Sequence, residues 1–137
     1  MAESLYRVVI YQEGITLAIK QVTVVSVPVS DQDRARAFYV DKLGFELIRE
    51  DASIPGFRWV QVAPKGAATS LTLVNWFDSM PAGSLQGLVF VADDLRAECE
   101  RLAADGAEFE QLPEERPYGL EAVLRDPDGN RLVLQQG

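Results

Sequence analysis

The order of elements in this chain can be followed from one stretch, VPVSDQDRARAFYVDKLGF, which occupies residues 27–45. It passes from β-branched residues through acidic residues that favour a helix start to a glycine that favours a helix stop. Ser30 with Asp33 three residues later resembles a capping box, so we predict a helix from Ser30 to Leu43, ended by Gly44. The apolar residues at helical spacing on one face are Ala35, Phe38, Tyr39 and Leu43.

The same pattern recurs 62 residues later in the chain. The matched pairs are Val27 with Val89, Val29 with Val91, Asp31 with Asp93, Arg34 with Arg96, Ala35 with Ala97, Gly44 with Gly106 and Glu46 with Glu108. A second helix is therefore predicted, beginning near Asp93 or Asp94 and stopping at Gly106. Its predicted buried face carries Leu95, Cys99, Leu102 and Ala103. One repeat of this length indicates two modules within a single domain, not a solenoid.

Each helix is surrounded by runs that are typical of strands. In the first half they are Val22–Val29, Phe45–Arg49, Phe57–Ala63 and Ser70–Trp76; in the second they are Leu88–Ala92, Glu108–Leu112, Glu121–Arg125 and Arg131–Gln135. The last two are joined by a strong turn, DPDG at residues 126–129. We therefore predict an α+β fold of two tandem βαβββ modules, at about residues 20–76 and 87–136, within one domain over residues 20–137. Residues 1–19 lie outside the repeat, as an extension with a predicted extra hairpin.

Composition excludes several classes of function. The chain has 137 residues, enough for one domain with a core of its own. A net charge of −8 argues against a nucleic-acid partner, because such binding needs cations against phosphates. There is no histidine, which removes imidazole metal ligands and histidine acid–base catalysis, and the single cysteine, Cys99, forms no intramolecular disulfide. We found no signal-peptide pattern and no apolar run long enough for a membrane span, so we expect a cytoplasmic protein with no membrane partner.

Three segments together resemble the vicinal oxygen chelate superfamily, which includes glyoxalase I, extradiol dioxygenases, fosfomycin-resistance enzymes and bleomycin-binding proteins. They are residues 27–45, RWVQVAP at 58–64, and YGLEAVLRDPDGN at 118–130. The resemblance covers about residues 20–136. It implies that the strands curl into an open, mixed β-sheet cup around a small-molecule cavity, with the helices packed outside. It also implies a homodimer, since the bleomycin-binding relatives place their grooves between subunits.

Enzymes of that superfamily hold a divalent metal in the cup. Carried over to this chain, the ligand positions fall on Val24, Thr72, Gly87 and Val133. Gln86 lies one register away from Gly87, and Leu73 is the next choice after Thr72. Divalent metals need converging carboxylate, imidazole or thiolate donors, which these residues do not supply. We therefore expect no metal and no cofactor.

Aromatic residues are the main candidates for ligand binding. Trp59, Trp76 and Phe57 lie on one predicted hairpin, where they either stack on a planar or cationic ligand or form ordinary sheet core. Phe90 either joins this cavity or helps to fill it. The resemblance implies that Tyr118 faces the cavity, because bleomycin-binding proteins carry a Trp-Gly or Tyr-Gly pair at that point; the alternative is a turn formed by Pro117, Tyr118 and Gly119.

Charged candidates are fewer. Arg58 could bind a carboxylate or phosphonate bidentately, or simply form a salt bridge. Glu121, with Tyr118, is the weak candidate for catalysis; its alternative is a solvent-exposed glutamate. Cys99, on the buried face of a helix, is more typical of packing than of a nucleophile.

The sequence is compatible with three functions. The resemblance and the missing ligands favour a metal-free protein that sequesters a small aromatic or cationic compound, as the antibiotic-resistance members do. The alternative is a metal-dependent lyase, isomerase or dioxygenase of the glyoxalase type. A third is an interaction role, with the cup filled by side chains.

Overall fold

The computed structural model describes residues 18–137. Module one consists of β1 (Val24–Pro28), α2 (Gln32–Ala37), the π-helical turn η1 (Phe38–Lys42), β2 (Glu46–Asp51), β3 (Trp59–Ala63) and β4 (Ser70–Val74). Module two consists of β5 (Leu88–Ala92), α3 (Leu95–Ala104), β6 (Glu108–Arg116), β7 (Gly119–Arg125) and β8 (Arg131–Gln136). The predicted βαβββ order is confirmed in both halves. The hairpin predicted near the N-terminus falls mainly on residues 1–17, outside the described residues.

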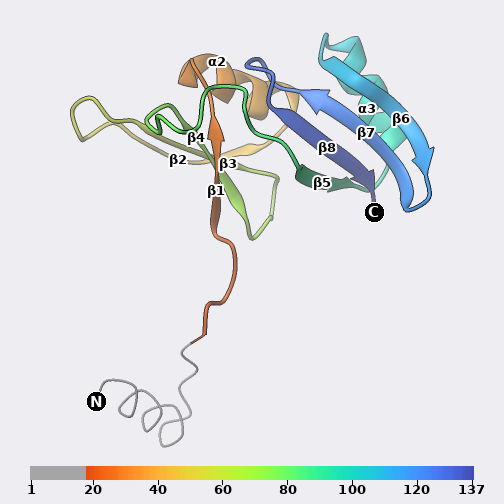
Figure 1. The fold of residues 1–137 in the computed structure, drawn as a ribbon, viewed down its shortest axis with the longest axis horizontal. Coiled ribbons are helices and arrows are strands. Elements are labelled where there is room, and N and C mark those ends of the chain that lie inside the picture. Colours follow the sequence, from red (N-terminus) through yellow and green to blue (C-terminus); the bar gives the residue numbers. More distant parts are fainter. Residues whose placement is uncertain (1–17) are drawn as a thin grey trace, which may run out of the picture.

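Each module forms one mixed, four-stranded sheet. The strand orders are β1-β4-β3-β2 and β5-β8-β7-β6, so the two sheets have the same topology. In each, the first and last strands of the module pair in parallel and the other neighbours are antiparallel. The sheets lie side by side, α2 covers one face of the first and α3 one face of the second (Figure 1). No strand of one sheet pairs with the other in the described part, so neither closes into a barrel.

The helix ends differ in part from the sequence prediction. The first helix is capped by Asp31, whose carboxylate accepts from the Arg34 backbone N–H at 3.1 Å, so the predicted Ser30 capping box is wrong. The reason is that the Ser30 hydroxyl donates instead to Asp128 at 2.6 Å. The second helix is capped by Asp94, as expected, through the Ala97 N–H. Ala103, predicted to be buried, is exposed, because only the face of α3 that holds Leu95, Cys99 and Leu102 packs on the sheet.

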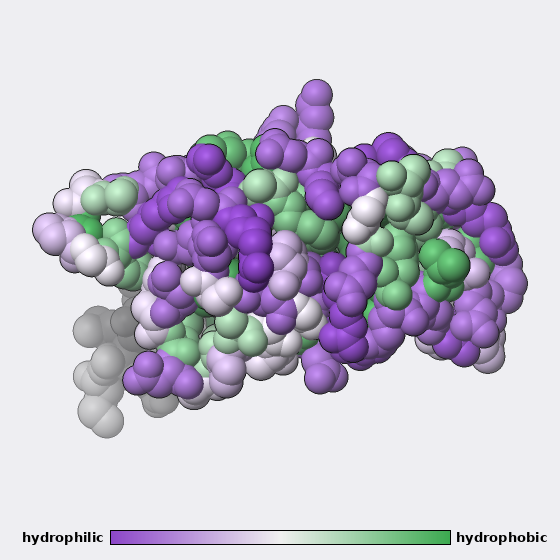
Figure 2. Space-filling model, turned by 90° about the horizontal axis from the view of Figure 1, so that it is seen from above, coloured by the Kyte–Doolittle hydropathy of each residue, from purple (hydrophilic) through white to green (hydrophobic). Residues whose placement is uncertain are grey.

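One core serves both modules. Side chains from the helices and from alternate strand positions pack into it, so each sheet has a helix side and an opposite face, here called the open face. In β3, Val60 and Val62 are buried on the helix side, whereas Trp59 and Gln61 lie on the open face. Hydrophilic residues cover much of the outer surface in the view from above, with apolar patches between them (Figure 2). No helix in the described residues is long and apolar enough to span a membrane.

The modules are joined at the turn between β7 and β8. Asn130 is 0% exposed, and its amide donates to the Pro28 carbonyl and to the Asp126 carboxylate, both at 2.8 Å. Its side-chain oxygen accepts from the Leu85 N–H at 2.9 Å. The Tyr39 hydroxyl donates to Asp126 at 2.9 Å, and burial with the Asp126 charge raises the pKa of Tyr39 well above its usual value, so this phenol stays a donor. The turn thus connects β1, the first helical segment and the linker before β5.

The linker reaches this turn through a glycine. Gly83 donates its N–H to the Pro28 carbonyl at 3.1 Å and has φ +83°, a conformation that L side chains rarely adopt. A Cβ atom at this position would lie 2.1 Å from the Asp128 carbonyl oxygen. The close approach of the linker to the turn therefore requires glycine.

Replacing Asn130 with Ala should destabilise the fold strongly. The substitution removes one hydrogen-bond partner from each of three groups: the Pro28 carbonyl, the Asp126 carboxylate and the Leu85 N–H. We expect this loss to lower the free energy of unfolding by about 2–4 kcal/mol. Urea denaturation measures this. Asn75→Ala is the control, because Asn75 is exposed and should change stability by less than about 0.5 kcal/mol. Equal effects in the two variants would contradict the role assigned to the turn.

Candidate functional site

Four aromatic side chains gather at the open face of the first sheet and the segment after β4. We call this the aromatic cluster: Phe57, Trp59, Trp76 and Phe77. Trp76 is central, with ring centroids 4.4 Å from Phe57, 5.9 Å from Phe77 and 6.4 Å from Trp59. The two indoles are stacked, with 25° between their planes. Both are half-buried, so ring surface remains accessible for stacking on a planar molecule.

Polar groups border this cluster. The Trp59 indole N–H donates to the Gln61 side-chain oxygen at 3.0 Å. A hollow of about 140 Å³ lies beside Trp59 and Phe57 and is also lined by Arg49, Asp51 and Ile54. Arg49 and Asp51 form an ion pair at 3.1 Å, and hydrogen bonds from Ser53, with Arg49, lower the pKa of Asp51 to about 2. The cluster therefore combines an aromatic wall with a polar edge of balanced charge.

Arg58 directly precedes β3, and its side chain points toward the first helix. Its guanidinium contacts Asp33 at 2.9 Å and Glu50 at 3.1 Å, which connects β3 to the first helix and to β2. Its hydrogen bond and charge lower the pKa of Asp33. Strand alternation separates Arg58 from its neighbours Phe57 and Trp59. Arg58 is thus engaged in the protein's own ion pairs, away from the aromatic cluster.

Tyr118 and Glu121 lie together in module two. The Tyr118 hydroxyl donates to Glu121 at 2.9 Å, the Gln135 amide donates to its other oxygen at 3.4 Å, and Arg116 lies 3.8 Å away. Tyr118 is 67% exposed, and the bond to Glu121 raises the pKa of its phenol. Glu121 pairs with Gln135 across β7 and β8, on the open face of the second sheet. This pair can offer hydrogen bonds to a ligand.

Phe90 occupies a third location. It faces Phe45, with the ring centroids 5.5 Å apart, in a groove between the two modules. Of the candidates from sequence, the structure therefore brings Phe57, Trp59 and Trp76 together and places the others elsewhere. Sequence reasoning missed Gln61 and the Arg49–Asp51 pair. Strand alternation alone would place Gln61 on the same face as Trp59. The position of Arg49 and Asp51 beside Trp59 depends on the pairing of β2 with β3, which the sequence does not reveal.

The four positions at which the superfamily's enzymes carry metal ligands do not suit a metal. Val24, Gly87 and Val133 offer no side-chain donor. The Thr72 hydroxyl lies 3.4 Å from the Ser26 hydroxyl, and a neutral hydroxyl pair is a poor ligand for a divalent cation. Across residues 18–137, no three carboxylate or thiol side chains converge as a metal site would require.

Cys99 is also unsuited to catalysis. It is buried in α3, and burial, with the nearby Glu98 charge, raises the pKa of its thiol to about 11. A thiol with this pKa carries almost no thiolate at neutral pH, and the thiolate is the nucleophile. The side chain therefore contributes packing.

The family model described as the Glyoxalase/Bleomycin resistance protein/Dioxygenase superfamily matches residues 19–134. The chain belongs to this superfamily. Among solved structures, it resembles TnmS3, an antibiotic binding protein from Streptomyces sp. CB03234, with 49% identity, a TM-score of 0.83, and 88% of this chain and 98% of that chain covered. A superfamily member from Sphaerobacter thermophilus DSM 20745 is 32% identical, with a TM-score of 0.81 and 87% and 98% covered.

A curated relative extends this comparison. The uncharacterized protein YetH of Bacillus subtilis (strain 168) is 34% identical over 121 residues, covering 86% of this chain and 99% of YetH. The superfamily resemblance seen in the helix caps and turns is thus confirmed over almost the whole described chain. Membership does not by itself select between binding and catalysis, because the superfamily's description includes resistance proteins and dioxygenases.

Proposed function

We propose that this protein binds and sequesters a small planar aromatic compound, without a metal, on the open face of the first sheet. The observation that carries the proposal is Trp76, which contacts both Phe57 and Trp59 and is only half-buried. Stacked aromatic side chains provide a large apolar surface at little cost in conformational entropy. The polar edge at Gln61, Arg49 and Asp51 would orient the ligand by hydrogen bonds.

The similarity to TnmS3 supports this proposal. That protein is an antibiotic binding protein, and nearly half of the aligned residues are identical to those of this chain. A second structure from the same Streptomyces strain, a glyoxalase/bleomycin resistance protein, is 48% identical. The ligand class is therefore proposed to be antibiotic-like, an aromatic molecule that is held rather than converted. A cytoplasmic location, expected from the sequence, belongs to the same proposal.

A homodimer completes the proposed site. The hollow beside Trp59 has about 140 Å³, whereas sites for drug-sized ligands span about 300–1,000 Å³, so one chain offers only part of an enclosure. An open face of a second copy would supply the other wall, with the polar pair Tyr118–Glu121 as a partner for the ligand. The edge strand β5 favours such pairing, because it carries no charge and its Val89 is 47% exposed.

Binding to the aromatic cluster is tested with two planar probes, uncharged acridone and cationic 9-aminoacridine. We expect either probe to quench tryptophan fluorescence. Trp76→Ala should weaken binding, measured by calorimetry, by about tenfold or more, since one lost stack costs about 1–3 kcal/mol. Trp76→Phe is the matched control and should retain most of the affinity because it keeps a ring. Equal affinity in the wild type and Trp76→Ala would show that the cluster is not the site.

The dimer is tested by light scattering after size exclusion. We expect the wild-type chain to elute as a dimer and Val89→Asp to elute as a monomer, because a buried unpaired carboxylate is costly at an apolar interface. Leu112→Asp is the control, since Leu112 is exposed on β6, far from the β5 edge of the sheet. A monomeric wild type at micromolar concentration would contradict the shared site.

Metal binding separates this proposal from the metalloenzyme alternative. Tag-free protein is mixed in turn with Zn²⁺, Ni²⁺, Mn²⁺ and Fe²⁺, and its melting temperature and metal content are measured. A ligand that binds only the native state raises the melting temperature by mass action. We expect no shift and no retained metal. One tightly held metal per chain would reinstate a lyase, isomerase or dioxygenase of the glyoxalase type.

A further inference from the structure

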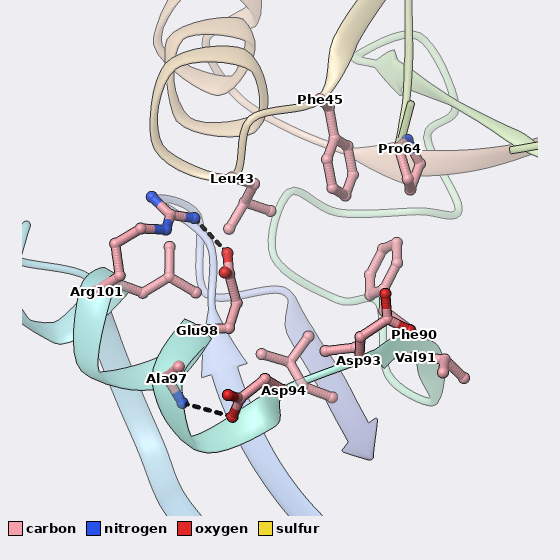
Figure 3. Close-up of a pocket in the computed structure, with 13 residues that line it drawn as sticks. Leu43, Phe45, Pro64, Phe90, Val91, Asp93, Asp94, Ala97, Glu98 and Arg101 are labelled. Carbon is pink, nitrogen blue, oxygen red and sulfur yellow. Dashed lines mark hydrogen bonds and ion pairs between the residues drawn. The ribbon is translucent and has the colours of Figure 1, made fainter. Parts of the chain in front are cut away.

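A second cavity lies between the modules, apart from the aromatic cluster. It has a volume of about 490 Å³, within the range of small-molecule sites. Figure 3 shows Phe45 and Pro64 reaching into it from module one, while Phe90 and the start of α3 approach from module two. We call it the inter-module groove. None of its lining residues lines the hollow beside Trp59.

The floor of the groove is apolar. Phe45 and Phe90 face each other with 5.5 Å between their ring centroids and 55° between their planes. Leu102 and Leu134, both buried, also line the groove, and so does Leu43, which follows the first helical segment. Such a floor suits a hydrocarbon or phenyl group of a ligand, since burying apolar surface is favourable and non-directional.

The rim of the groove is acidic. Asp93, Asp94 and Glu98 line it, and Arg101 is the single cation among its lining residues. Arg101 is already bound to Glu98 and to the Lys42 carbonyl, and Asp94 is engaged at the Ala97 N–H (Figure 3). The Asp93 carboxylate has no hydrogen bond or ion pair with another residue of the described chain. The rim thus keeps an excess of negative charge beside an apolar floor.

We infer that the inter-module groove binds an amphiphilic amine, a compact cation whose ammonium group lies at Asp93 and whose apolar body packs onto the contacting rings of Phe45 and Phe90. Charge complementarity selects the cation, and aromatic rings favour an adjacent ammonium group. The ligand would contact both modules at once. This site is separate from the aromatic cluster, so amine binding here does not depend on whether the aromatic cluster binds a ligand.

Three probes of one shape isolate the role of charge: 4-phenylbutylamine, 4-phenylbutanol and 4-phenylbutyrate. Calorimetry on the full chain should rank their affinities amine, alcohol, acid, with the amine favoured over the alcohol by about two- to fivefold, as is typical of one exposed ion pair. Binding of the amine should weaken as salt is added. Equal affinities for all three probes, or a preference for the acid, would overturn the inference.

Variants locate the binding. Ala97 lines the groove and is exposed, so Ala97→Arg should abolish binding of the amine, and Ala97→Met, which fills space without adding charge, should weaken it. Asp93→Asn should reduce affinity to that of the alcohol. Ala103→Arg is the matched control on the same helix, outside the groove, and should bind normally. Trp76→Ala should also bind the amine normally; a loss there would place the amine at the aromatic cluster and overturn the inference.

Two other occupants would contradict the inference. If Ala97→Arg converts a dimer into a monomer, the groove is an interface with a second copy. If hydrogen exchange of the full chain shows protection of residues 5–11 that Ala97→Arg removes, the groove holds the chain's own N-terminal segment. Unchanged oligomeric state and unchanged exchange at residues 5–11, with loss of amine binding, support the small-molecule site.

Discussion

The buried amide of Asn130 is the constraint on which the arrangement of the two modules depends. The sheets share no strand pairing, so backbone ladders do not hold one module against the other. Asn130 instead binds the end of β1, the linker at Leu85 and its own turn at Asp126. Contacts at the helix ends add to this, because Lys42 and Arg101 each donate to a carbonyl of the other module. The open faces and the inter-module groove take their relative positions from these bonds together with the shared hydrophobic core.

Local signals in the chain predict much of the fold. The internal repeat, the helix stops at glycine and the turn at residues 126–129 reveal both modules and their order. What local signals miss are partners far away in sequence. The turn appears as an ordinary hairpin connection, yet its Asn130 bonds Pro28 across 102 residues. Ser30 has the features of a helix cap, but its hydroxyl donates a hydrogen bond to Asp128, 98 residues away. Asp31 caps the helix instead.

The candidate site was predictable to the extent that it follows strand alternation. Alternation separates Trp59 from Arg58, and the structure has them on opposite sides of β3. Alternation does not say which side meets the helix, so the sequence leaves core packing and ligand contact equally open for Trp59. The burial of Val60 and Val62 places Trp59 on the open face, away from the helix-side core. The sequence leaves the same ambiguity for Phe90. It lies against Phe45 between the modules, a contact that depends on how the two halves meet.

The division of each sheet into a helix side and an open face has an evolutionary consequence. Folding depends on the helix sides and on the central turn, while recognition would be concentrated on open faces that contribute less to the core. Substitutions at residues such as Trp59, Gln61 or Val133 therefore change what the surface can hold at a modest cost in stability. Because the unit is duplicated, one face can diversify while its counterpart retains its chemistry. Such a scaffold can acquire new specificities through successive substitutions, each of which leaves a folded protein.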